Sequence, residues 1–126
     1  MRSVIIAGVL LIIIVGMVIF GGSYTKETTL FFNEQLDALQ NAVEQGRWDE
    51  AHRIAQKLNA AWEEHRSYLA MLFSHQELDQ IESAFVRLEQ YAKGGAEMDV
   101  LAELSVAQTL VKHLPVKYRI TIENLF

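Results

Sequence analysis

The sequence predicts an all-α protein with a single N-terminal transmembrane helix followed by an antiparallel bundle of about four helices. Three observations lead to this expectation. An uncharged apolar run lies near the N-terminus, the chain contains only one proline, and apolar residues beyond the run recur at alternating spacings of three and four. With 126 residues, the chain has room for one small domain besides the apolar run.

The apolar run extends from Val4 to Phe20, and two glycines lengthen it to 19 residues. At about 1.5 Å per helical residue it is roughly 28 Å long, close to the thickness of the hydrocarbon core of a bilayer. We therefore expect residues 1–23 to form a signal-anchor that contacts the lipid bilayer through residues 4–22. The competing interpretation is a cleaved signal peptide, with small residues up to Ser23 preceding the cut. A lipidated cysteine and disulfides are excluded, because the chain has no cysteine.

The charges that flank the run indicate an orientation. Arg2 precedes it without a neighbouring acid, whereas Lys26 is followed directly by Glu27. Because positive residues favour the cytoplasmic side, residues 24–126 are expected to form an extracytoplasmic domain of a single-pass cell-membrane protein. Without Arg2, 10 basic and 16 acidic residues remain. This negative balance argues against nucleic acid as a partner and against docking flat on anionic lipid.

Four amphipathic stripes follow the run, and each predicts one helix. The first is expected over residues 29–45 and ends at Gly46; a capping-box pattern, Ser74 with Glu77, precedes the third. The expected inward-facing residues are, stripe by stripe, Phe32, Leu36, Leu39 and Val43; Trp48, Ala51, Ala55, Leu58, Trp62, His65, Leu69 and Leu72; Leu78, Ile81, Phe85, Leu88 and Ala92; Val100, Leu104, Ala107, Val111, Leu114, Tyr118, Ile122 and Leu125. No stripe can be buried alone, so the helices are expected to pack as an antiparallel bundle joined by short turns.

Two features complicate this simple scheme. Pro115 interrupts the last stripe without changing its phase, which predicts a kinked helix or two coaxial pieces. A 34-residue helical repeat is suggested by the segment at residues 46–51, but no second copy of that segment exists.

Trp62 and His65 are the first two of four candidate ligand or partner contacts. Trp62 is expected to be a core anchor, and it would become a partner or membrane contact only if exposed. His65 lies on the apolar stripe, where a buried imidazole must find a hydrogen-bond partner. The ordinary interpretation is a neutral histidine bound by a neighbouring helix. The alternatives are a protonation or ligand switch and a bundle edge that faces a partner.

His75 and Asp79 are the other two candidates, and with Glu82 they share one face of the third predicted helix. Such a face could hold a hard or borderline metal ion. Acidic residues near a helix N-terminus also simply suit the helix dipole, and a solvated face is the ordinary interpretation. We therefore assign no metal ligand, catalytic residue or cofactor.

No catalytic or phosphate-binding motif appears in the chain. Each predicted helix uses its one inward stripe to close the bundle, which leaves no pocket of converging polar groups of the kind enzymes need. The sequence therefore favours a non-enzymatic interaction or accessory module for another membrane protein. The alternative is an extracytoplasmic sensor that binds a metal ion or small solute through His65, or through His75 with Asp79.

Nearly the whole chain resembles a known family. Trp62, the segment Ser-His-Gln-Glu-Leu-Asp-Gln-Ile at residues 74–81, and the terminal Ile-Glu-Asn-Leu-Phe are similar to a bacterial family catalogued as domain of unknown function 4363. The resemblance implies a bacterial, membrane-associated helical domain and supplies no activity.

Overall fold

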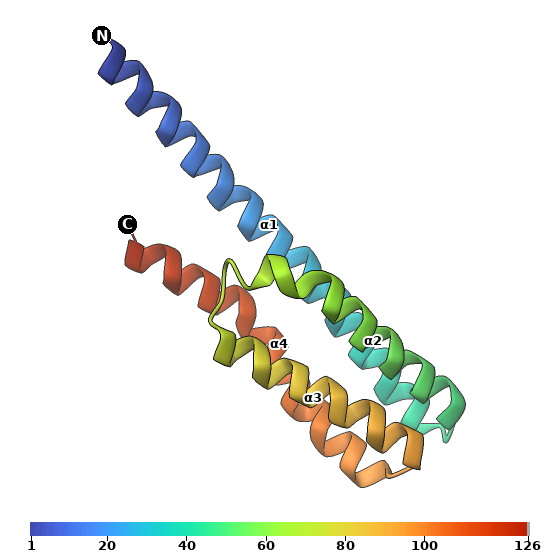
Figure 1. Cartoon of the computed structure of the whole chain (residues 1–126). Helices are drawn as coiled ribbons and strands as arrows, with labels where there is room; N and C mark the ends of the chain where they lie inside the picture. Colours follow the sequence, from blue (N-terminus) through green and yellow to red (C-terminus); the bar gives the residue numbers. More distant parts are fainter. Residues whose placement is uncertain (126) are drawn as a thin grey trace.

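The computed structural model describes residues 1–125 as four helices joined by short turns (Figure 1). The helices are α1 (Arg2–Glu44), α2 (Trp48–Leu69), α3 (His75–Gly94) and α4 (Glu97–Leu125). No strand occurs in this described range. The predicted all-α fold class is confirmed.

Residues far apart in the sequence close the bundle. α1 packs against α2 and α4, and α3 packs against the same two helices. Each helix therefore lies beside its neighbour in sequence, and α4 returns to α1 (Figure 1). The predicted stripes from Phe32 to Leu114 form the buried core, except that Trp48, His65 and Leu72 are half-buried. The side chain of Leu125 lies outside the described part of the chain.

Glycines with positive φ follow two of the helices, one of them the predicted Gly46, and the predicted capping box begins α3. Gly46 and Gly95 adopt positive φ values of 72° and 68°, a backbone conformation that costs glycine nothing because it has no Cβ. At the start of α3, the Ser74 hydroxyl accepts from the Glu77 backbone N–H at 3.3 Å, and the Glu77 carboxylate accepts from the Ser74 N–H at 3.2 Å. These devices fix where the bundle turns.

Two boundaries differ from the expectation. α1 continues from Arg2 to Glu44 without the break expected between residues 23 and 29. Two adjacent glycines weaken a helix by only about 1 kcal/mol each, whereas an unpaired backbone in apolar surroundings costs more. α2 ends at Leu69 rather than Leu72. Of the two arrangements expected at Pro115, the structure shows a single helix rather than two coaxial pieces, because α4 continues through the proline.

The first part of α1 projects beyond the bundle (Figure 1). We call residues 4–20 the apolar extension. Its side chains are exposed, for example Val4 at 76% and Ile12 at 72%. α1 is long and apolar enough to cross a membrane, and only 6% of its most apolar 18-residue window is buried. We call the end of the bundle from which it projects, near the C-terminus of α4, the extension end.

Candidate functional site at the extension end

Aromatic side chains gather where α1 enters the bundle. Phe20 and Tyr24 come from α1 and Tyr68 from the last turn of α2. The ring centroids of Tyr24 and Tyr68 are 4.1 Å apart, and Phe20 lies 5.9 Å from Tyr68 and 6.3 Å from Tyr24. Aromatic pairs at such distances contribute beyond their buried area. We call these three residues the aromatic cluster; it joins the base of the apolar extension to the end of α2.

His65 binds to the edge of this cluster. Its Nδ1 is 2.5 Å from the Tyr24 hydroxyl oxygen, and its ring lies edge-on to Phe32 with a centroid distance of 6.0 Å. His65 is half-buried rather than buried, and a neighbouring helix, α1, supplies the hydrogen-bond partner that the sequence required. Burial raises the pKa of the Tyr24 hydroxyl above its ordinary value, so Tyr24 stays a neutral phenol at neutral pH. A neutral Tyr24 can donate to an unprotonated Nδ1 or accept from a protonated one.

Tyr118 of α4 forms a second connection to the base of the extension. Its hydroxyl donates to the Val18 carbonyl at 2.7 Å. A Cβ at Gly21 would lie 2.6 Å from the same hydroxyl oxygen, so this close approach needs glycine there. Sequence reasoning found Tyr118 only as a stripe residue and Gly21 only as part of the apolar run. One signal could have predicted this contact. Gly21 lies on the face of α1 that continues the inward stripe, where a glycine allows another helix to approach closely.

Trp62 is not part of this end. It is 1% exposed and lies in the core, with ring centroids 5.8 Å from Phe32 and 5.6 Å from Phe85. Its position makes it a packing residue with no surface to offer a partner.

The predicted acidic face of α3 is directed toward α2. Arg66 binds Asp79 at 2.7 Å and Glu82 at 3.0 Å, and the hydrogen bond to Asp79 raises the pKa of Arg66 further above its ordinary value. His75 is exposed at the start of α3 and takes no part in the two ion pairs of Arg66. Among the residues that the structure describes, no three His, Cys, Asp or Glu side chains are placed to share a metal ion. Sequence reasoning did not identify Arg66 as the partner of the two acids.

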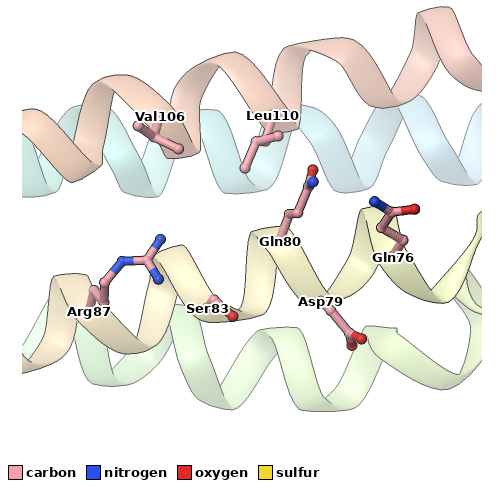
Figure 2. A pocket seen from close by; sticks show the side chains of 7 residues that line it. All are labelled: Gln76, Asp79, Gln80, Ser83, Arg87, Val106 and Leu110. Carbon is pink, nitrogen blue, oxygen red and sulfur yellow. The ribbon is translucent and has the colours of Figure 1, made fainter.

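A groove of about 630 Å³, lined by five polar and two apolar residues, lies between α3 and α4 (Figure 2). α3 contributes Gln76, Asp79, Gln80, Ser83 and Arg87, and α4 contributes Val106 and Leu110. Both charged groups are already ion-paired. Asp79 points away from α4 toward Arg66 of α2 (Figure 2), and Arg87 binds Glu103 at 2.8 Å. The groove therefore offers amides and a hydroxyl for hydrogen bonding, and its two charged groups already have ion-pair partners.

Comparison with known proteins agrees with the resemblance found in the sequence. No curated protein and no solved structure matches the chain. The family model described as "Domain of unknown function (DUF4363)" matches residues 19–125, which include the base of the apolar extension and the whole described bundle. The chain therefore belongs to the DUF4363 family.

Proposed function

We propose that the protein is a non-enzymatic, single-pass membrane protein whose bundle serves as an interaction or accessory module for another membrane protein. One observation carries the proposal. α1 is a single helix from Arg2 to Glu44, with an exposed apolar first half and a core-forming second half. A helix exposed over so many apolar residues needs an apolar solvent, and the extension has about the length of a bilayer's hydrocarbon core.

The aromatic cluster supports placing the bundle directly at the membrane surface. Tyrosines are enriched where a spanning helix leaves the hydrocarbon, because the ring is apolar and the hydroxyl is polar. Tyr24, Tyr68 and Tyr118 all lie at the extension end. No flexible linker separates the extension from the bundle, so the module stands at a fixed height above the lipid.

The absence of an enzymatic role is inferred from how the polar groups are used. The inward stripes close the core, and the charged residues of the α3–α4 groove are held in ion pairs. An active site needs convergent polar groups that are free to act on a substrate. A partner, by contrast, needs only the exposed helix faces, and these are available.

Alkaline carbonate extraction tests the anchor. The full-length protein should stay in the membrane pellet, whereas a variant that lacks residues 2–20 should move to the supernatant. A mature form that begins near Tyr24 would show that the extension is a cleaved signal and would contradict the proposal.

The proposed extracytoplasmic orientation can be tested with a single cysteine, because the chain has none. Met98 is 85% exposed at the far end of the bundle, so Met98→Cys should react with a membrane-impermeant maleimide on intact cells. Labelling only after cell lysis would reverse the orientation.

A metal titration tests the non-sensor part of the proposal. A ligand that binds the native state raises the melting temperature. If the protein binds no metal ion, its melting temperature should therefore be the same with divalent cations and with EDTA. A rise that His75→Ala abolishes would instead support the sensor alternative.

A further inference from the structure

The last turns of α4 lie beside the apolar extension. Ile122 lines an apolar groove of about 290 Å³ together with extension residues, namely Leu11, Ile14, Val15, Val18 and Ile19. Tyr118, one turn earlier, is bonded to the Val18 carbonyl. In Figure 1 the C-terminal end of α4 reaches past the α2–α3 turn along the same side as the extension. We call residues 112–123 the α4 tip.

The outward face of the α4 tip combines two apolar residues with two cations, and Glu123 adds one exposed acid one turn after Arg119. Val116 and Ile120 are one helical turn apart, on the side opposite Tyr118, and they are 40% and 50% exposed. Lys112 precedes Val116 by one turn, and Arg119 stands next to Ile120 in sequence; both cations are exposed. Where a helix end meets a membrane, lysine and arginine extend their charged groups to the headgroups while neighbouring apolar side chains contact lipid.

The charge of the tip is opposite to that of the bundle. Residues 112–123 contain three basic residues and one acid, whereas residues 24–111 contain 7 basic and 15 acidic residues. Lys117 is occupied by Glu77 at 3.2 Å, which leaves Lys112 and Arg119 directed to the surroundings. The tip is thus suited to phosphate groups that the acidic remainder of the bundle would repel.

We propose that the α4 tip is a second membrane contact, which seats Val116 and Ile120 in the interface of the leaflet nearest the bundle and sets Lys112 and Arg119 against anionic phospholipid headgroups. This inference rests on the proposed anchoring role of the extension. The length of the extension brings the α4 tip to the membrane interface. The run of 19 residues ending at Gly22 spans roughly 28 Å, and a bilayer core is about 30 Å thick, so a bilayer that covers the extension must also reach the level of Ile122.

Single-cysteine variants of the full chain, labelled with an environment-sensitive fluorophore, test this contact in phospholipid vesicles. Ile120→Cys reports the tip, Ile12→Cys the extension and Met98→Cys the far end; all three sites are exposed. In vesicles containing phosphatidylglycerol, the label at residue 120 should be quenched by spin-labelled lipid and shielded from aqueous iodide. The label at residue 98 should show the reverse.

The three reporters distinguish the possible failures. Lipid quenching at residue 12 together with iodide quenching at residue 120 would overturn the tip contact and leave the anchor in place. Iodide quenching at residue 12 would overturn the anchor itself. A label at residue 120 that is shielded from both quenchers would show that protein, a second copy or another partner, covers the tip instead of lipid.

The headgroup part of the proposal has a charge-matched control. In the Ile120→Cys background, Lys112→Gln with Arg119→Gln should weaken docking by roughly fivefold for each cation in anionic vesicles, seen as increased iodide quenching. Arg53→Gln with Lys57→Gln removes the same charge from exposed positions on α2 and should leave quenching unchanged. Equal behaviour of the two double variants would overturn headgroup recognition.

Discussion

The two halves of α1 belong to one helix and meet two different environments. In the apolar extension, apolar residues occur at nearly every position and point in all directions, so Ile12 is 72% exposed. In the bundle half, they recur with helical periodicity, and Phe32, Leu36 and Leu39 are fully buried. The comparison teaches that the spacing of apolar residues, rather than their number, decides whether a stretch of helix is covered by its own chain.

The bundle half should be far more sensitive to a charge on its stripe than to one off it. Leu36→Asp places a carboxylate among fully buried side chains and should destabilise the bundle by about 3–5 kcal/mol, a large share of a small domain's stability. Leu30→Asp is the control, since Leu30 is 53% exposed on the same helix half. Thermal melts of full-length protein in detergent, followed by circular dichroism, provide the measurement; equal melting temperatures for the two variants would refute the predicted core.

The junction of the two halves can be probed with a pair of neighbouring glycines. Gly21→Ala drives a methyl group into the Tyr118 hydroxyl, whereas the nearest atom to a Cβ at Gly22 is 3.5 Å away. Both changes gain the same helix propensity, so Gly21→Ala should be less stable than Gly22→Ala by about 1–2 kcal/mol, through overpacking and a weakened hydrogen bond to Val18. The same melts measure the difference, and a more stable Gly21→Ala would show that Tyr118 does not press on this residue.

High pH should lower the stability of the bundle through the tyrosines at the extension end. Burial raises the pKa of both Tyr24 and Tyr118, so the folded state favours the neutral phenols. Their stabilising contribution is fully present below the unfolded pKa of about 10 and is lost as pH rises through the higher folded value. The melting temperature should therefore fall above about pH 10, and less steeply in Tyr24→Phe. An unchanged slope in Tyr24→Phe would contradict the assignment.

The smallest effect is expected at His65. His65→Leu should change the free energy of unfolding by no more than about 1 kcal/mol, because Leu fits an apolar stripe and the half-buried Tyr24 hydroxyl can turn to water. A double-mutant cycle with Tyr24→Phe measures the hydrogen bond between the two side chains directly. A melting temperature that varies strongly between pH 5 and 8, and loses this dependence in His65→Leu, would favour the switch interpretation.

Periodicity was sufficient to predict the core but not the continuity of α1. The spacing of Phe32, Leu36 and Leu39 specifies one face of a helix, and such faces can be read without knowing their partners. The glycines at residues 21 and 22 and the nearby charges suggested an end to the anchor, although glycine alone does not stop a helix whose backbone has no better partner.

The contacts of the candidate site were harder to predict, because a stripe does not say which helix each residue meets. His65 required a partner, but periodicity could not distinguish Tyr24 from any other donor on α1 or α3. Asp79 and Glu82 were visible as a pair on one face, while Arg66 was one of many charged residues on α2. Such pairings depend on the relative rotation and height of packed helices, and these follow only from the assembled core.

The unbroken α1 also has a mechanical consequence. Its 43 residues make a rod of roughly 65 Å, of which the part beyond Gly21 is about 35 Å. With the extension in a bilayer, a change in tilt of about 10° would move the far end of α1 sideways by roughly 6 Å. Spanning helices change tilt by such amounts when bilayer thickness changes. The hydrogen bond from the Tyr118 hydroxyl to the Val18 carbonyl ties α4 to α1 on the N-terminal side of the two glycines. This bond limits bending of α1 at the glycines.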